Sequence, residues 1–575
     1  MAKQTALGNP SHTARLSYYD HDMSMIRKFS SSVGQLLPVY YDMLYPGDKV
    51  DFSTEMFSRF DVMSTPAMVQ VTQHVDWFFV PLTQLYQFFG DWIFGIQDFK
   101  TDFIQPSGST SPVVQSVLPS VQLNRLHQHY KAATVKYSAL TDVEKDLFGV
   151  PKFFNDIRLL ELLGYSSHAT DYDNANVSVN PFMLAAYQKI FYDVYRISDR
   201  QANDPQAYNF DSIRSSTAIT NARAAKLMEL HYRPWKSDFF TSVKVSPIVS
   251  NQDIGMMSTE NLTAVNNWLN SVGLADGDIT FTASTLDTMK NGSNNGLQQM
   301  LTQTADGDSK TRLTTSDLRS LFAVEKLAEI TRRAAKHYDA QVLAHFGFDV
   351  PTGIAGEVYR LGSDIAQIQI DTIEGTATTG VGDNTSRLGE LAGKGTSYGN
   401  NKTKHFTAPC HGILMAIYSA VPESDYSSDG FDRLNSYLFR EDYYQPELEN
   451  IGMQPLFGYQ SYFEGNVAEN GSILGWQWRY FESKVKHNVI NGSFNYTDKN
   501  WTTSKSFTDG RFENKLSDFL ISPNYMDSVL DFSFQNAADD PMTKEVCFGR
   551  DPLKHMFQFH VHKKNHMSPF SLPSL

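Results

Sequence analysis

Cysteine is scarce in this sequence, and the signals of secretion are missing. Cys410 and Cys547 are its two cysteines among 575 residues, too few for the disulfide framework of a small secreted domain. No CxxC pair and no cysteine and histidine spacing typical of a zinc site is present. Residues 1–20 contain no apolar core of a secretory signal. We therefore expect the protein to act where it is made, or to leave the cell by another route.

Positive charge is also in short supply. The chain has 49 lysine and arginine residues against 63 aspartate and glutamate residues, a formal net charge of -14. This sign is wrong for a protein that binds nucleic acid over its whole surface, because such binding depends on cations that neutralise phosphates. Any contact with nucleic acid is therefore expected to be local, or to be left to a separate partner.

The aromatic segment at residues 68–94, MVQVTQHVDWFFVPLTQLYQFFGDWIF, is not a membrane span. Polar side chains interrupt it, whereas a span needs roughly 18 apolar residues in succession. Apolar residues alternate before Pro81 and recur at helical spacing after it, which predicts a half-buried strand and then a short amphipathic helix. Most of these rings are then core side chains; the alternative is an aromatic platform that binds sugars or bases.

Alternating apolar and polar residues recur at places far apart in the sequence. These period-two patterns, each of which predicts a strand, occupy residues 47–60, 411–422, 473–487 and 555–562. Dispersed strands with long connections favour a mainly β sandwich of Greek-key type.

The connections between these strands differ in character. Residues 181–200 and 315–347 have the apolar spacing of amphipathic helices, with Gly347 suited to end the second one. Residues 250–315 are polar and predict a surface excursion, whereas residues 373–404 are rich in glycine and predict a long loop.

Motifs that carry catalysis or hold cofactors are absent. No GxSxG or HExxH pattern occurs, and the glycines of residues 391–397 do not have the spacing of a phosphate-binding loop. His560 and His562 share one face of a predicted strand, but no third metal ligand is identifiable beside them. We therefore predict no enzyme activity, no catalytic residue, no metal site and no cofactor. The basic run HVHKKNH at 560–566 instead predicts contact with phosphate.

Several blocks of the sequence resemble the major capsid proteins of the microviruses (Microviridae), particularly the gokushovirus-like branch. The blocks that carry the resemblance are residues 37–60, the WFFVP of 77–81, AYQKIFYDVYRISDRQ at 186–201, HYRPWKSDFFTS at 231–242, and residues 318–347 and 411–458. Their order and spacing match the family pattern. The resemblance implies an eight-stranded antiparallel viral jelly roll, formed by two packed four-stranded sheets, with long and partly helical insertions.

The resemblance also implies how the chain is organised. Residues 1–35 form an N-terminal arm, expected on the inside of a shell, and residues 36–575 form one jelly-roll domain. The insertions in this domain are expected at about 85–245 (helices and loops), 250–315 (a surface protrusion) and 373–404 (the glycine-rich loop), with a C-terminal tail at 563–575.

A function and a set of partners follow from the same resemblance. Copies of the chain are expected to assemble, in the cytoplasm of a bacterial host, into a T=1 icosahedral shell around a circular single-stranded DNA genome. The expected partners are further copies of the chain, the DNA, a small basic DNA-binding virion protein, a minor or pilot protein and a host receptor, which the surface insertion contacts. The alternative is a carbohydrate-binding or carbohydrate-active β sandwich, with Trp476, Trp478 and Tyr480 as a row of stacking rings.

Two groups of side chains are predicted to act in a shell. The residues expected to face the DNA are Arg15, Arg27, Lys28, His560, His562, Lys563 and Lys564. The residues expected to anchor one subunit on another are Phe239, Phe240, Tyr443, Tyr444 and Phe570. If the first group is right, replacing Lys563 and Lys564 by glutamate lowers genome retention.

Overall fold

The fold is described from a computed structural model. It covers residues 17–94, 118–127, 141, 144–149, 152–165, 177–213, 219–247, 323, 326–327, 329–331, 333–334, 337–374, 391–463, 471–505, 512, 514–530 and 551–567. Contacts divide the chain into two compact units, one made of Met1–Val245 with Asp349–Leu575 and the other of Ser246–Phe348.

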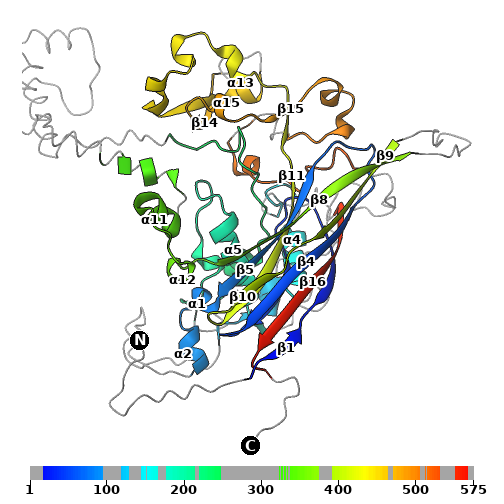
Figure 1. Ribbon diagram of the computed structural model, residues 1–575, viewed down its shortest axis with the longest axis vertical. Coiled ribbons are helices and arrows are strands. Elements are labelled where there is room, and N and C mark those ends of the chain that lie inside the picture. Colours follow the sequence, from blue (N-terminus) through cyan, green and yellow to red (C-terminus); the bar gives the residue numbers. More distant parts are fainter. Residues whose placement is uncertain are drawn as a thin grey trace, which may run out of the picture. The chain divides into compact units, whose positions relative to one another are not determined.

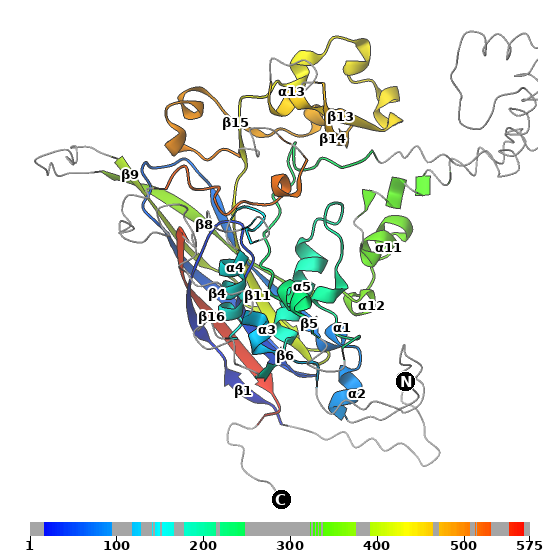
Figure 2. The same ribbon diagram turned by 180° about the vertical axis from the view of Figure 1, so that it is seen from behind.

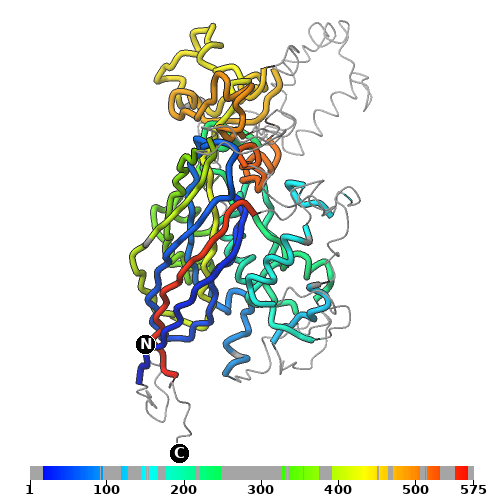
Figure 3. The backbone as a smooth tube through the Cα atoms, turned by 90° about the vertical axis from the view of Figure 1, so that its right-hand side faces the viewer, coloured from blue at the N-terminus to red at the C-terminus, as the bar shows by residue number. Residues whose placement is uncertain are grey.

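A ten-stranded antiparallel sheet is the centre of the first unit (Figure 1). Its strands are β1 (Tyr19–Asp22), β2 (Met25–Ser31), β3 (Leu37–Leu44), β4 (Lys49–Phe60), β5 (Val71–Pro81), β8 (Tyr359–Glu374), β9 (Leu391–Asn400), β10 (Lys404–Thr407), β11 (Gly412–Pro422) and β16 (Leu553–Asn565). The order is β1-β16-β4-β9-β8-β5-β11-β3, with β2 also paired to β16 and β10 to β4. Figure 3 shows β16, in red, beside the blue N-terminal strands that pair with it.

The sheet curls so that its two halves face each other across one core. Strand β8 pairs with β5 through its first part and with β9 through its last part, so it belongs to both halves. Trp77 on β5 is buried between them, with its ring centre 4.5 Å from that of Phe52 on β4 and 6.0 Å from that of Phe559 on β16. The predicted fold class, a mainly β jelly roll, is confirmed. The two halves are joined through β8 into one continuous sheet, rather than standing as two separate sheets.

Strand β9 corrects the prediction of a loop at residues 373–404. Residues 391–400 pair with β4 and with β8, because glycines let the chain approach its neighbours closely. A Cβ atom on Gly395 would lie 2.8 Å from Cβ of Phe60, and one on Gly399 would lie 2.6 Å from Cβ of Ala366. The glycines therefore allow β9 to pack closely against its neighbours. Residues 375–390 of the predicted loop lie outside the described residues.

The strand-to-helix change predicted at Pro81 is confirmed. Strand β5 ends there, and helices α1 (Leu82–Leu85) and α2 (Phe89–Phe94) follow. The segment after them contains β6 (Val121–Gln122), α3 (Leu123–His127), α4 (Lys152–Leu162), β7 (Ser178–Val179), α5 (Phe182–Ile190), a π-helical turn η3 (Phe191–Tyr195) and α6 (Asn221–Met228). Helix α4 packs on β3 and helix α5 on β5 and β11 (Figure 2). None of the described helices is long and apolar enough to cross a membrane.

Residues 423–530 form a second insertion, between β11 and β16. It contains the parallel pair β12 (Asp425–Ser427) with β15 (Asn488–Ile490), the antiparallel pair β13 (Met453–Phe457) with β14 (Ile473–Trp478), and helices α13 (Gly458–Ser461) and α15 (Phe481–Lys484). The strand predicted over 473–487 therefore ends at Trp478. Tyr480 has a left-handed backbone with φ of 57° and begins α15.

The second unit, Ser246–Phe348, is described in part. Helix α11 (Tyr338–Phe346) ends at Gly347, whose left-handed backbone caps it, as the sequence predicts. The predicted protrusion at 250–315 lies outside the described residues. After this unit the chain re-enters the first unit through α12 (Thr352–Ala355).

Candidate functional site

Strand β16 presents two faces of opposite character. Burial alternates along its whole length, as a strand with one face on a core requires. The inward side chains are Leu553, His555, Phe557, Phe559, Val561, Lys563 and Asn565. The outward side chains are Lys554, Met556, Gln558, His560, His562 and Lys564.

The outward face carries four of the predicted DNA-facing residues. His560, His562 and Lys564 follow one another on β16, and Lys28 on β2 is exposed opposite Met556. Their contacts with carboxylates are loose: His560 Nε2 lies 3.5 Å from Glu55 Oε1, and Lys564 Nζ lies 4.0 Å from Asp51 Oδ2. Exposed pairs of this kind contribute at most about 1 kcal/mol. The exposed side chains of Lys28, His562 and Lys564 are therefore available to an external anion, whereas Nε2 of His560 is buried.

Two other residues that were predicted to face the DNA make their polar contacts within the subunit. Lys563 is 5% exposed, and its Nζ lies 2.9 Å from Asp42 Oδ2 and 3.6 Å from Asp48 Oδ2. Arg27 also points inward, and its guanidinium donates hydrogen bonds to the carbonyl oxygens of Val39 and Leu162. Neither residue presents its charge on the outward face, which corrects their assignment. Arg15 lies outside the described residues.

Two histidines that sequence reasoning assigned no role are buried in a neutral form. His555 Nε2 lies 2.8 Å from Ser31 Oγ and its Nδ1 lies 2.7 Å from Ser58 Oγ. His231 Nε2 lies 2.6 Å from Gln188 Oε1. Burial lowers the pKa of each ring to about 3, because a charged imidazole would lose its hydration without gaining an anionic partner. Both are therefore structural groups at neutral pH.

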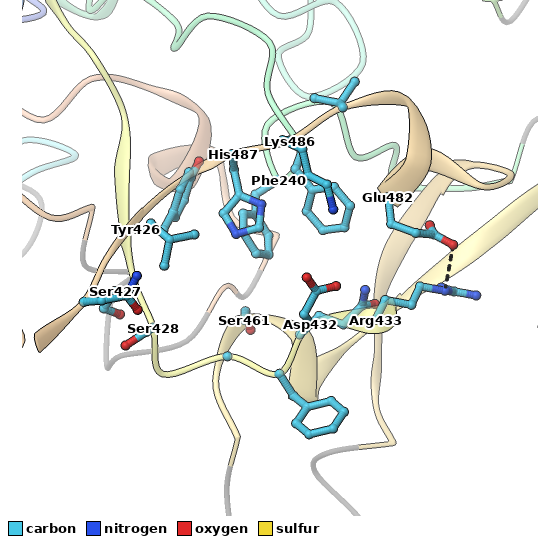
Figure 4. A pocket seen from close by; sticks show the side chains of 17 residues that line it. Phe240, Tyr426, Ser427, Ser428, Asp432, Arg433, Ser461, Glu482, Lys486 and His487 are labelled. Carbon is cyan, nitrogen blue, oxygen red and sulfur yellow. Dashed lines mark ion pairs between the residues drawn. The ribbon is translucent and has the colours of Figure 1, made fainter. Parts of the chain in front are cut away.

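A pocket of about 300 Å³ opens in the second insertion (Figure 4). Its lining includes Phe240, Tyr426, Asp432, Gln460, Lys486 and His487. In Figure 4 the rings of Tyr426, Phe240 and His487 lie on one side, Asp432 points toward them from the other, and the ion pair of Arg433 with Glu482 lies at one end. The pocket therefore combines an apolar aromatic wall with a rim that carries both signs of charge.

One polar group in the pocket is left without a partner. Gln460 is buried, and its Oε1 accepts a hydrogen bond of 2.9 Å from the backbone N–H of Phe457. Its Nε2 has no hydrogen-bond partner within the described part of the chain. Burial also lowers the pKa of His487, so this ring stands in the pocket as a neutral group. The pocket lining thus includes a residue with a buried unpaired donor, together with an uncharged aromatic surface.

The residues beside the pocket form an exposed segment, 437–444, called here the 437–444 loop. Its apolar side chains reach outward, with Leu438 81% and Phe439 69% exposed. The backbone is nevertheless fixed, because Asp442 Oδ2 accepts hydrogen bonds from the N–H groups of Leu438 and Phe439 at 2.9 and 2.8 Å. The Tyr437 hydroxyl donates to Glu482, which also lines the pocket. The loop therefore holds apolar side chains in solvent beside an open pocket.

Comparison with known proteins decides what kind of protein carries these features. A family profile described as capsid protein (F protein) matches residues 10–137 and 155–560. The chain belongs to this family of capsid proteins. It is 22% identical over 580 residues to capsid protein VP1 of Bdellovibrio phage phiMH2K, which covers 94% of this chain and 96% of the relative. It is also 25% identical over 252 residues to capsid protein VP1 of Chlamydia phage 1, covering 40% and 41% of the two chains. The predicted membership of the microvirus capsid proteins is confirmed.

In this capsid protein the predicted intersubunit anchors have different environments. Phe239 and Phe240 are buried in a second core with Tyr426, Leu456 and Phe481, so neither ring is free at the surface to anchor a neighbour. This position corrects their assignment, since both rings hold the second insertion together.

The other anchors stay predictions. Tyr443 and Tyr444 are 59% and 57% exposed on the 437–444 loop. Phe570 lies outside the described residues.

The carbohydrate alternative has no support in this capsid protein. Strand β14 ends at Trp478, and Tyr480 is buried with its ring centre 5.4 Å from that of Tyr444. The three rings of the predicted stacking row therefore do not form an exposed platform. Within the described residues, no group of three or more histidine, cysteine, aspartate and glutamate side chains is placed to hold a metal ion.

Proposed function

We propose that this capsid protein assembles with copies of itself into a T=1 icosahedral shell that encloses a circular single-stranded DNA genome. The observation that carries the proposal is the match to a capsid protein family over almost the whole chain. The jelly-roll sheet is a rigid body on which loops and insertions can meet neighbouring copies. The work of such a protein is association rather than catalysis, and closed rotational symmetry keeps the assembly finite.

In this proposal the outward face of β16 and β2 meets the DNA. Lys28 and Lys564 supply cations, and His562 supplies an exposed imidazole that can donate a hydrogen bond to phosphate, with His560 beside it on the same face. The neighbouring carboxylates Glu55 and Asp51 limit the strength of this contact. The net charge of -14 therefore makes a separate small basic virion protein the main partner of the genome. A minor or pilot protein completes the virion, and the shell forms in the cytoplasm of the bacterial host.

The surface insertion at residues 250–315 is proposed to contact the receptor of the host. This segment is polar and lies in the second unit, so it can vary without disturbing the sheet. Exchanging it for a short linker should leave shells intact and abolish adsorption to host cells, which a binding assay on whole cells would measure.

The proposed assembly is tested directly by particle formation. We expect the protein produced with its genome to elute as uniform particles in size-exclusion chromatography, and to appear as closed hollow spheres in negative-stain microscopy. DNA inside them should resist nuclease. A small species that never closes into shells would overturn the proposal.

Reversing the two outward lysines is expected to weaken the contact with DNA. The double variant Lys28→Glu with Lys564→Glu loses two phosphate contacts. For single-stranded DNA, the fall of the log binding constant with log salt should therefore become shallower, its slope decreasing in magnitude by about 1.4. Binding of labelled single-stranded DNA to dissociated subunits at several salt concentrations measures this. The matched control is Lys236→Glu with Lys499→Glu, which makes the same charge change at exposed positions elsewhere. Equal slopes in the two double variants would contradict the assignment of this face.

A further inference from the structure

The pocket of the second insertion and the 437–444 loop are complementary surfaces. We propose that the pocket of one subunit receives the 437–444 loop of a second copy of this chain. The inference rests on the proposed function, since it supplies one of the contacts by which copies would associate.

The apolar side chains of the 437–444 loop are exposed. Leu438 and Phe439 reach into solvent although hydrogen bonds to Asp442 fix the backbone that carries them. Exposed apolar side chains on a fixed segment are typical of residues that become buried on association. Because the loop is already ordered, binding it costs little further conformational entropy.

The pocket has an apolar wall and a polar group without a partner within the described residues. Its aromatic wall, built from Phe240, Tyr426 and His487, matches apolar side chains. A volume of about 300 Å³ is within the range of sites that take a small ligand or a few side chains. The unpartnered Nε2 of Gln460 requires an acceptor, and the backbone carbonyl groups of an incoming loop supply one.

The pocket and the 437–444 loop carry charges of opposite sign. Lys486 lines the pocket, whereas Glu441 lies on the loop, and within the described residues neither side chain has an ion-pair partner. Asp432 on the rim and Arg440 on the loop form a second pair of opposite sign. The proposed contact places Glu441 beside Lys486 and Arg440 beside Asp432, so that each charge meets one of opposite sign.

The partner is a second copy because a subunit does not fill its own pocket. Contacts from Tyr437 to Glu482, and from the Tyr480 hydroxyl to the carbonyl oxygen of Tyr443 at 3.2 Å, hold the loop beside the pocket of its own subunit. Leu438 and Phe439 remain exposed in that position. Rotation-related copies can then place the loop of each subunit in the pocket of the next one, which closes a ring.

Charge reversal with rescue tests the contact. We expect Lys486→Glu and Glu441→Lys each to lower the yield of closed shells by about tenfold, because like charges then meet at the rim. The double variant, which restores opposite charges, should recover the wild-type yield. Sedimentation and negative-stain microscopy measure the yield, and circular dichroism checks that each variant is folded. Single variants that assemble as the wild type does would overturn the proposal, as would a double variant that shows no recovery.

Disulfide trapping provides a second test that does not depend on yield. In the double variant Phe439→Cys with Ser461→Cys, mild oxidation of assembled shells should link copies into a ladder on a non-reducing gel. Each single variant should give no more than the background from the native cysteines. Intact shells without the ladder would overturn the inference while leaving the proposed function standing. Failure of the wild-type protein to form shells would instead overturn the proposed function, and the inference with it.

Discussion

Replacing Lys563 by methionine is expected to destabilise the isolated subunit by about 3 to 5 kcal/mol, because it leaves the buried carboxylate of Asp48 and the partly buried carboxylate of Asp42 without this cation. The Lys563 ammonium lies between Asp42 and Asp48, and Asp48 is 2% exposed. It also donates to the carbonyl oxygen of Met43. These contacts tie the end of β16 to the end of β3 and to the connection between β3 and β4.

The neighbouring lysine provides a matched control. Lys564→Met removes the same charge from the outward face, where the surroundings are exposed, and should change the free energy of unfolding by no more than about 0.5 kcal/mol. Urea denaturation of dissociated subunits measures both variants. Equal effects would show that the buried pair is not needed for stability. The Lys563→Glu variant is expected to unfold. A loss of genome retention in this variant would therefore not be evidence that Lys563 contacts DNA.

Acid is expected to unfold the subunit through His231 and His555. Burial lowers the pKa of both rings to about 3, whereas an unfolded histidine titrates near 6.5. Between these values the unfolded state binds more protons, so the stability is fully present above about pH 6.5 and is lost as the pH falls. Below pH 6.5, each ring lowers the free energy of unfolding by about 1.4 kcal/mol per pH unit. The two rings together therefore lower it by about 5 kcal/mol at pH 4.5.

Two buried carboxyl groups act in the opposite direction. Burial raises the pKa of Asp156 and of Glu229, so their contribution is present at low pH and is lost as the pH rises through their folded-state pKa values. The pH dependence of the unfolding free energy in the wild type therefore combines the histidines with these carboxyl groups. Comparing this dependence between the wild type and a histidine variant isolates the contribution of that histidine.

Glutamine variants isolate the histidine effect from these carboxyl groups. In His231→Gln and in His555→Gln, the slope of unfolding free energy against pH between 6.5 and 4.5 should decrease by about 1.4 kcal/mol per pH unit relative to the wild type. Urea denaturation at several pH values gives this slope. Phe210→Leu, a change in a fully buried ring, should lower stability without altering the slope. Parallel curves for the histidine variants and the wild type would rule out the buried neutral rings as the source of acid sensitivity.

The alternation of apolar and polar residues predicted much of the fold. A strand with one buried face needs apolar side chains at every second position, which constrains its sequence strongly. The alternation in β4, β5, β11 and β16 is visible without a structure. The same alternation places Lys563 with Phe559 and Val561 on the buried face, so the position of this lysine was available from the sequence. Its charge and its neighbour Lys564 instead suggested that Lys563 is exposed to solvent, because buried lysines are rare unless they are paired.

Other parts could not be predicted from local pattern. Strand β9 contains glycines where a strand usually has branched side chains. The close approach of Phe60 and Ala366 explains Gly395 and Gly399, and that of the Thr65 carbonyl oxygen explains Gly393. The pocket takes its wall from Phe240, its rim from Asp432 and its unpartnered donor from Gln460, which are far apart in the sequence. Such a site depends on the tertiary fold, and no single segment contains its signal.

The position of β16 has a consequence for biosynthesis. This strand lies between β4 on one side and β1 and β2 on the other, yet the ribosome makes it long after all three. Until then β4 has an unpaired edge, and β1 and β2 lack the strand that they pair with. A chain interrupted before residue 553 therefore cannot complete the sheet. We therefore expect incomplete translation products to lack the completed sheet that the proposed assembly requires.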